Sequence, residues 1–232
     1  MPSLLAVTFD AQDPVRLAQF WASVLGREVL QDAGGWLLPG DDGQLGLRFV
    51  PGRQEQVGPN RMHVHLSSVS PADQQETVVR ALGLGGCHLD VGQRPEEGHI
   101  VMGDPEGNAF CVIEPDNAFL AGCGFLAELA CEGTREVGQF WSLALDWMLV
   151  WDRDEETAIQ STQGGTKVAW GGPPVPPMAG RNHERFELCA VGEPGVEADR
   201  LVSLGASRLA VEEAGAVSLA DPDGNEFCLR VR

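Results

Sequence analysis

The stretch DPEGNAFCVI at residues 104–113 returns as DPDGNEFCLR at residues 221–230, and this repeated stretch decides the fold. In both copies, a proline follows the aspartate and a glycine stands two residues after the proline. Proline fixes φ at the first corner of a tight turn, and glycine takes the left-handed conformation that other residues resist. The apolar residues that follow are typical of a strand. Each copy therefore predicts a tight turn that joins the last two strands of a structural unit.

Two further pairs of segments repeat in the same order. LAQFWASVLG at 17–26 matches VGQFWSLALD at 137–146, and NRMHVHL at 60–66 matches NHERFEL at 182–188. Three pairs in one order, at an offset of about 120 residues, indicate a duplicated unit. We predict a first domain over residues 1–115, a linker over 116–123 and a second domain over 124–232.

Each repeat divides again into two similar modules. Asp13-Pro14 and Ser70-Pro71 each place a helix-capping residue before a proline at the first helical position. Apolar residues at helical spacing follow both pairs, and Gly26 closes the first helix. Short strands separated by Gly and Asp turns fill the remainder. The order is βαβββ twice per repeat, so we predict an α+β protein of four βαβββ modules.

The composition of the chain limits the classes of binding partner that we expect. Asp and Glu number 34 against 16 Lys and Arg, a formal net charge of −18, so we expect no nucleic-acid partner. No apolar run approaches the roughly 18 residues that cross a bilayer, and the first residues lack the pattern of a secretory signal. We therefore expect a cytoplasmic protein with no membrane partner. The six cysteines form no C-x-x-C pair, so we expect free thiols.

The doubled βαβββ module, the FW pair on the first helix of each repeat and the closing DPxGNxFC hairpin resemble the vicinal oxygen chelate superfamily. This superfamily holds glyoxalases, extradiol dioxygenases and bleomycin-resistance binding proteins. The resemblance covers nearly the whole chain. It implies two tandem glyoxalase-like domains with cup-shaped, mostly antiparallel curved sheets. It specifies the fold better than the chemistry, because the superfamily contains lyases, oxygenases, epimerases and pure binders.

The resemblance also implies where a metal would bind. Metal-dependent members use a His or Gln on the first strand, a His on the first strand of the second module and a Glu on the last strand. The matching positions are Ala6, His63 and Cys111 in the first repeat and Leu126, Arg185 and Cys228 in the second. Ala, Leu and Arg do not ligate metals here, so the usual site is absent and we expect no cofactor.

A substitute metal site is the alternative. In the first repeat, the side chains that could converge on Zn, Fe, Mn or Ni are Asp10, His63, His65 and Cys111. Asp10 lies either on the cup face of its strand or in the loop before the helix. A poorer set in the second repeat comprises Glu128, Glu187 and Cys228.

Three functions stay open. The first is binding of a small hydrophobic or amphipathic molecule without metal, as in sequestration or resistance. Its candidate ligand-binding residues are Thr8, Arg48, His63, His65, Cys111, Glu128, Trp170, Arg185, Glu187 and Cys228. Of these, Arg48 points either into the first cup or to solvent, and Trp170 could line the second.

The second function is an enzyme, either a lyase, an isomerase or a dioxygenase. It would use a non-standard metal set or acid–base catalysis by His63 with Asp10, because a His paired with a carboxylate is a workable general base. The third is a structural or protein-binding role with vestigial cups. Duplication also lets the four modules pair within one chain, so we expect a monomer rather than a homodimer.

Overall fold

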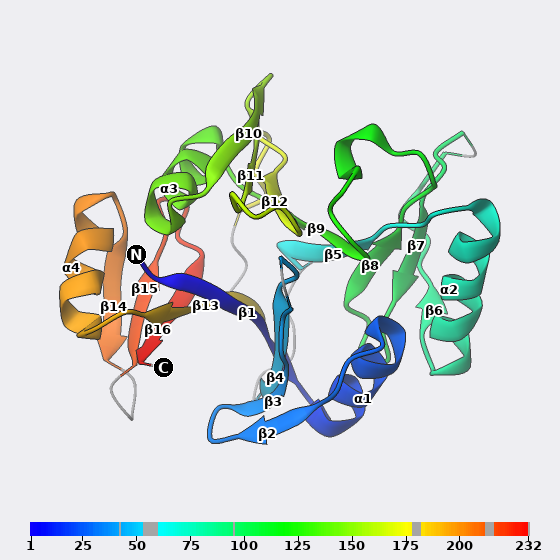
Figure 1. Cartoon of the computed structure of the whole chain (residues 1–232), viewed down its shortest axis with the longest axis horizontal. Helices are drawn as coiled ribbons and strands as arrows, with labels where there is room; N and C mark the ends of the chain where they lie inside the picture. Colours follow the sequence, from blue (N-terminus) through cyan, green and yellow to red (C-terminus); the bar gives the residue numbers. More distant parts are fainter. Residues whose placement is uncertain (42, 53–59, 95, 178–181, 212–215, 232) are drawn as a thin grey trace.

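The structure is a computed structural model that describes residues 1–41, 43–52, 60–94, 96–177, 182–211 and 216–231 (Figure 1). The first module comprises β1 (Ser3–Ala11), α1 (Pro14–Leu25), β2 (Leu30–Asp32), β3 (Gly35–Leu38) and β4 (Gly46–Pro51). The second comprises β5 (Met62–Leu66), α2 (Pro71–Gly83), β6 (Cys87–His88), β7 (Ile100–Gly103) and β8 (Ala109–Val112). A 3₁₀ helix, η1 (Ala118–Leu120), lies between the repeats.

The second repeat has the same order. Its first module comprises β9 (Leu126–Cys131), α3 (Arg135–Leu145), β10 (Met148–Arg153), β11 (Glu156–Gln160) and β12 (Lys167–Trp170). Its second comprises β13 (Glu184–Ala190), α4 (Pro194–Ser203), β14 (Ser207–Val211), β15 (Val217–Ala220) and β16 (Glu226–Val231). The prediction of an α+β chain with four βαβββ modules is confirmed. None of the helices within the described residues is long and apolar enough to span a membrane.

The helix ends follow the local sequence signals. The Asp13 side chain accepts a hydrogen bond from the Arg16 backbone N–H at 3.1 Å, and the Ser70 hydroxyl accepts one from the Asp73 N–H at 3.1 Å. Both bonds satisfy N–H groups that the first turn of a helix leaves without a partner. Gly26 ends α1 with φ of 67°, in the left-handed region where glycine carries no steric cost.

The strands form two eight-stranded sheets. Sheet A has the order β14-β15-β16-β13-β1-β4-β3-β2, and sheet B has the order β10-β11-β12-β9-β5-β8-β7-β6. Within a module the first and last strands pair in parallel, as β1 with β4, and the other neighbours are antiparallel. Modules join through their first strands, which pair antiparallel as β1 with β13 and β5 with β9.

The two sheets cross the repeat boundary. Sheet A joins the first module to the fourth, and sheet B joins the second to the third. Our expectation that each repeat curls into its own cup is therefore wrong. All four modules offer an equivalent first strand, and the chain pairs these strands between repeats. This pairing between repeats determines which candidate residues lie close together.

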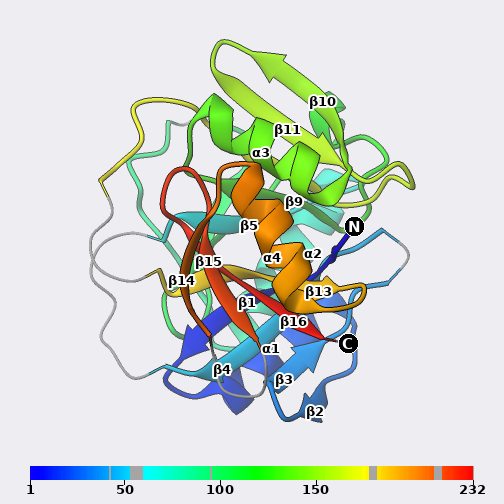
Figure 2. The ribbon, with the colours of Figure 1, turned by 90° about the vertical axis from the view of Figure 1, so that its left-hand side faces the viewer.

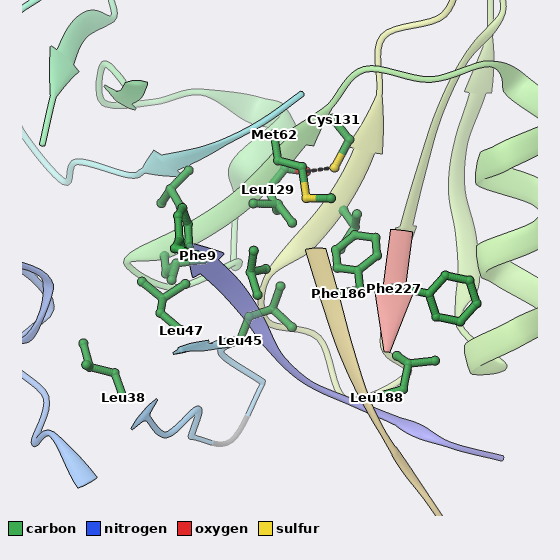
Figure 3. Close-up of a cluster of buried hydrophobic side chains, with 14 of the residues drawn as sticks. Phe9, Leu38, Leu45, Leu47, Met62, Leu129, Cys131, Phe186, Leu188 and Phe227 are labelled. Carbon is green, nitrogen blue, oxygen red and sulfur yellow. Dashed lines mark hydrogen bonds between the residues drawn. The ribbon is translucent and has the colours of Figure 1, made fainter. Parts of the chain in front are cut away.

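The main apolar core lies between the sheets. It takes Val7, Phe9 and Leu47 from sheet A and Met62 and Leu129 from sheet B, together with residues of all four helices. Figure 3 shows side chains of both sheets within a single cluster. Each helix contacts the strands of its own module, and Figure 2 shows α3 and α4 on their respective sheets. The opposite, concave face of each sheet carries polar side chains, and on sheet B it also carries a second, smaller apolar cluster that includes Cys111 and Leu120.

The repeated motifs hold the modules together. Trp21, from the FW pair on α1, donates its indole N–H to Asp104 of the DPEGN turn at 3.2 Å. Trp141 on α3 makes the same bond to Asp221 of the DPDGN turn, also at 3.2 Å. Both tryptophans are about 1% exposed and lie edge-on against the phenylalanine that follows the turn. Two of the three repeated motifs that indicate the duplication are thus packing partners.

Candidate functional site

Four side chains form a line across the middle of sheet B, which we call the central row. Lys167 on β12 stands opposite Glu128 on β9, Glu128 opposite His65 on β5, and His65 opposite Cys111 on β8. Alternate residues of a strand share a face, and the neighbours Val64, Leu129 and Val168 belong to the apolar core. The row therefore lies on the concave face.

A short hydrogen bond joins the two middle members of the row. His65 Nδ1 lies 2.6 Å from Glu128 Oε2, and both side chains are mostly buried. Burial lowers the pKa of His65, but hydrogen bonds to Cys111 and Glu128 outweigh it and raise the pKa to about 9. At neutral pH the His65 ring is therefore protonated.

His63 shares the concave face two residues away on the same strand. Its ring centroid lies 4.7 Å from that of His65. Burial and the positive charges of His65 and His99 lower the pKa of His63 to about 4, so it is neutral at physiological pH. The sheet thus holds one charged and one neutral imidazole side by side.

A cavity of about 780 Å³ opens next to this row. Ala130 and Ala169 form part of its floor, and Phe119 and Trp151 stand at its wall. Its polar lining comprises His63, Glu128, Glu132, Glu156, Thr157 and Lys167. The volume lies within the range of pockets that hold small molecules, and small floor residues beside aromatic walls suit an apolar ligand body.

The inter-repeat segment closes one side of the cavity. The Phe119 ring packs edge-on against Trp151, with centroids 5.9 Å apart. The Lys167 ammonium lies 4.3 Å from the centre of the Phe119 ring and donates to the Phe119 carbonyl oxygen. Leu120 lies beyond it in a small apolar cluster with Cys111. Figure 1 shows this segment between β8 and β9 arching over sheet B. It therefore covers the β8 half of the concave face and leaves the cavity over the β9–β12 half.

Sheet A carries the corresponding row with different chemistry. Arg48 lies 3% exposed, donates from Nε to Glu187 at 2.6 Å and also binds Asp32 at 2.5 Å. The Thr8 hydroxyl donates to the same Glu187 carboxylate at 3.1 Å, and Cys228 stands opposite Glu187 on the next strand. Of the two orientations left open for Arg48, the concave face is the one adopted. A buried ion pair fills the centre of this cup.

Two predicted convergences fail because the sheets cross the repeat boundary. Asp10 lies on sheet A, where its carboxylate accepts from Arg185 at 2.7 Å, so it does not join His63. The acid–base pair and the four-residue metal set that included Asp10 are wrong. Glu128 lies on sheet B and is separated from Glu187 and Cys228 on sheet A, so the second predicted set also fails.

The remaining candidates divide cleanly between the sheets. His63, His65, Cys111 and Glu128 meet on sheet B, and Trp170 borders the cavity there rather than a cup of the second repeat alone. Thr8, Arg48, Arg185, Glu187 and Cys228 lie on sheet A.

Three side chains that could coordinate a metal together do cluster on sheet B. The ligand atoms of His63, His65 and Cys111 lie within 4.8 Å of one another. The carboxylate beside them, Glu128, is already bound by His65. The hard, carboxylate-bearing ligand set of the superfamily does not fit this arrangement, because the carboxylate next to the cluster already serves an ion pair with His65.

Sequence reasoning missed Phe119, Trp151 and Lys167. A signal existed for Lys167: it is the sole lysine of the chain and alternates with apolar residues on a strand. Phe119 carried no such signal, because it falls in the segment that composition assigns to a connector.

Comparisons with known proteins agree with this architecture. A family model described as "Glyoxalase-like domain" matches residues 6–113 and 127–230. Glyoxalase I from Zea mays superposes with a TM-score of 0.72 at 14% identity, over 100% of this chain and 92% of the other. A putative dioxygenase from Bacillus subtilis gives a TM-score of 0.64 at 14% identity, over 99% and 84%. No curated protein matches the sequence. At these identities the solved structures support the fold alone.

Proposed function

The chain belongs to the glyoxalase-like domain family, and from this premise we propose that the cavity over sheet B binds a small amphipathic molecule without a bound metal. The observation that carries the proposal is the cavity of about 780 Å³ with Ala130 and Ala169 in its floor and Phe119 and Trp151 at its wall. An apolar ligand body would rest on the alanines, and its polar end would reach the central row.

The chemistry of the lining supports an amphipathic rather than a purely apolar ligand. Lys167 has three N–H donors and uses one on the Phe119 carbonyl, so it can donate to a ligand oxygen. Glu132 and Glu156 add acceptors to the lining. A ligand that leaves these groups without partners would lose affinity, because a buried polar group without a hydrogen bond is costly.

Filling the cavity tests the proposal. In a thermal-shift screen of small amphipathic compounds, we expect the native protein to be stabilised by a subset of them. Ala169→Leu adds bulk to the cavity floor and should weaken binding of those compounds at least about tenfold, or roughly 1.4 kcal/mol. Ala72→Leu makes the same change at an exposed position of α2 and should leave binding unchanged. Equal affinities in all three proteins would refute the cavity as the binding site.

Metal analysis tests the second half of the proposal. We expect the purified, untagged protein to contain far less than one metal ion per chain, and its melting temperature to be the same with and without a chelator. A bound ion would raise the melting temperature in proportion to its affinity. One zinc ion per chain, lost together with that stabilisation in Cys111→Ser, would contradict metal-free binding.

A further inference from the structure

The floor of the cavity lies between two groups of charged side chains. In the central row, Lys167 on β12 stands opposite Glu128 on β9. Two residues further along these strands, Ala169 stands opposite Ala130, and both line the cavity. Glu132 comes two residues after Ala130 and lines the cavity as well. Because a strand rises about 3.3 Å per residue, the backbone of Glu132 lies about 13 Å from that of Glu128. The alanines therefore separate a lysine end from a glutamate end.

Glu156 supplies the second carboxylate of the glutamate end. It precedes Thr157, which stands opposite Trp170, so Glu156 comes level with Gly171 just after β12. Gly171 donates its backbone N–H to the last residue of β9 at 3.2 Å, and Glu132 follows that residue. Gly171 therefore lies between the strands that carry the two glutamates. A Cβ on Gly171 would meet no atom within 4 Å, so the space there is open.

The two carboxylates are available to a ligand. Glu132 is half-buried, and Glu156 is exposed at the edge of the cavity. Within the described part of the chain, neither side chain takes part in a hydrogen bond or an ion pair. Glu128, by contrast, already binds His65. The formal net charge of −18 adds a long-range attraction for cations. These features favour a positively charged group at the glutamate end.

The lysine end has the opposite preference. The Lys167 ammonium donates to the Phe119 carbonyl oxygen and lies 4.3 Å from the centre of the Phe119 ring. These contacts hold the ammonium where the inter-repeat segment borders the cavity. It retains N–H donors for an oxygen of a ligand, and it repels a second cation. The lining therefore orients a ligand that has unlike ends.

Sheet A does not offer this combination. Its matching strands place Thr8 opposite Arg48 and, two residues further along, Asp10 opposite Val50. Asp10 binds Arg185 at 2.7 Å, so an ion pair and a branched side chain occupy the places where sheet B has alanines. The small floor between charged ends is therefore a feature of sheet B.

We propose that the cavity selects elongated amines, whose ammonium group binds Glu132 and Glu156 while an oxygen acceptor at the other end binds Lys167. This rests on the proposed function, to which it adds the class of the ligand and its direction in the cavity. The apolar middle of the molecule lies over the alanine floor. An ammonium group donates to both carboxylates at once, and hydrogen bonds between charged partners are stronger than neutral ones.

Calorimetric titration of the native, full-length protein tests the glutamate end. The probes are 4-phenylbutylamine and 4-phenylbutan-1-ol, which share one apolar body and differ in a cationic or a neutral end. At low ionic strength we expect the amine to bind at least about fivefold more tightly than the alcohol. High salt should reduce this preference, because it screens charges that are partly exposed.

Replacing both carboxylates assigns the preference to residues. In the protein with Glu132→Gln and Glu156→Gln, the amine should lose its advantage while the alcohol keeps its affinity. Glu76→Gln makes the same change at an exposed position of α2, outside the cavity, and should keep the advantage.

A third probe tests the lysine end. The compound 4-(4-aminobutyl)benzamide adds a carbonyl group to the end of 4-phenylbutylamine that is remote from the ammonium. We expect it to bind about threefold more tightly than 4-phenylbutylamine, because Lys167 gains an acceptor. Lys167→Met should abolish that gain. An undiminished gain in Lys167→Met would overturn the proposed direction of the ligand.

Several outcomes would overturn the preference for amines. Equal affinities of the amine and the alcohol would do so and would leave binding in the cavity intact. A preference that survives the double substitution would place the cation elsewhere. Absence of binding by both probes would overturn the inference as well. Failure of the cavity itself appears separately, as probe affinities that Ala169→Leu leaves unchanged.

Discussion

At the residue scale, the two sheets differ by the partner given to one carboxylate. In sheet B, Glu128 binds an imidazole, and in sheet A, Glu187 binds the guanidinium of Arg48. An Arg–carboxylate pair stays charged across the physiological pH range, whereas a His–carboxylate pair can exchange a proton within reach of neutral pH. Sheet B therefore has an ion pair whose charge changes with pH, and sheet A has an ion pair whose charge does not change over the physiological pH range.

This difference predicts a pH dependence of stability. The pKa of His65 is about 9 in the folded protein and near 6.5 when unfolded, so its contribution is complete below pH 6.5 and is lost as pH rises through 9. The loss could reach about 3 kcal/mol. Denaturant unfolding between pH 6 and 10 should show a decline that His65→Asn reduces and that His88→Asn, at an exposed position, retains. The same decline in both variants would assign it to another group.

Sequence predicts much of this centre but not its key contact. His63 and His65 alternate on one strand, and the last strand of the same module carries Cys111, so their meeting follows from the βαβββ order. The bond between His65 and Glu128 does not follow, because it joins the second module to the third. No local pattern specifies which of four similar first strands will pair. Asp10 was misplaced for the same reason.

At the element scale, the segment between the repeats does more than connect them. Composition predicted a linker, since proline, aspartate and glycines surround it. Its turn does lie outside the strands, but η1 and its neighbours pack on the concave face of sheet B and bound the cavity. Contacts that hold it come from residues distant in sequence. Trp151 and Lys167 of the third module contact Phe119, and Gln44 of the first module donates to the Cys123 carbonyl oxygen at 2.6 Å.

Phe119→Ala tests this role. The change removes the ring that packs against Trp151 and lies under the Lys167 ammonium, while the backbone bond from Lys167 remains possible. We expect amide hydrogen exchange over residues 117–123 to accelerate by about tenfold, with sheet A unaffected. Ligands of the cavity should bind more weakly. Val191→Ala, at a side chain that is 81% exposed, is the control and should change neither property. Unchanged exchange in Phe119→Ala would mean that the other contacts of the segment, such as the hydrogen bond from Gln44 to the Cys123 carbonyl oxygen, hold it without the ring.

At the scale of the whole molecule, the pairing of modules between repeats makes the folding of each repeat depend on the other. Sequence predicts two tandem domains because the motifs recur in order, and the family model matches the chain twice. The sequence does not predict that each sheet takes one module from each repeat. Pairing within a repeat and pairing between repeats would both give the same first strands a partner. Polar contacts reinforce the pairing between repeats: Asn60 Nδ2 donates to Asn108 of its own repeat at 3.0 Å and to Glu184 of the other at 2.6 Å.

Separating the repeats is therefore a test of the architecture. A chain of residues 1–115 would leave the first strands β1 and β5 without their partners β13 and β9, and would expose the core face that both repeats cover. An unpaired strand edge beside apolar surface favours association. We expect residues 1–115 and 124–232, expressed alone, to self-associate or aggregate. When coexpressed, they should form a one-to-one complex with the circular dichroism and melting cooperativity of the intact chain.

Size-exclusion chromatography with light scattering would measure the outcome directly. A folded, monomeric 1–115 fragment with protected amides in β1 and β5 would mean that a repeat can close its own cup, and the pairing across repeats would then be one of two accessible arrangements. A self-associated fragment that converts to the one-to-one complex on mixing would mean that each first strand pairs with whichever equivalent first strand is present. In that case Glu128 reaches His65 only through this pairing, and the fragment 1–115, which keeps Cys111 but lacks Glu128, should have a lower His65 pKa than the complex. An NMR titration of the His65 ring in the fragment and in the complex would detect that decrease.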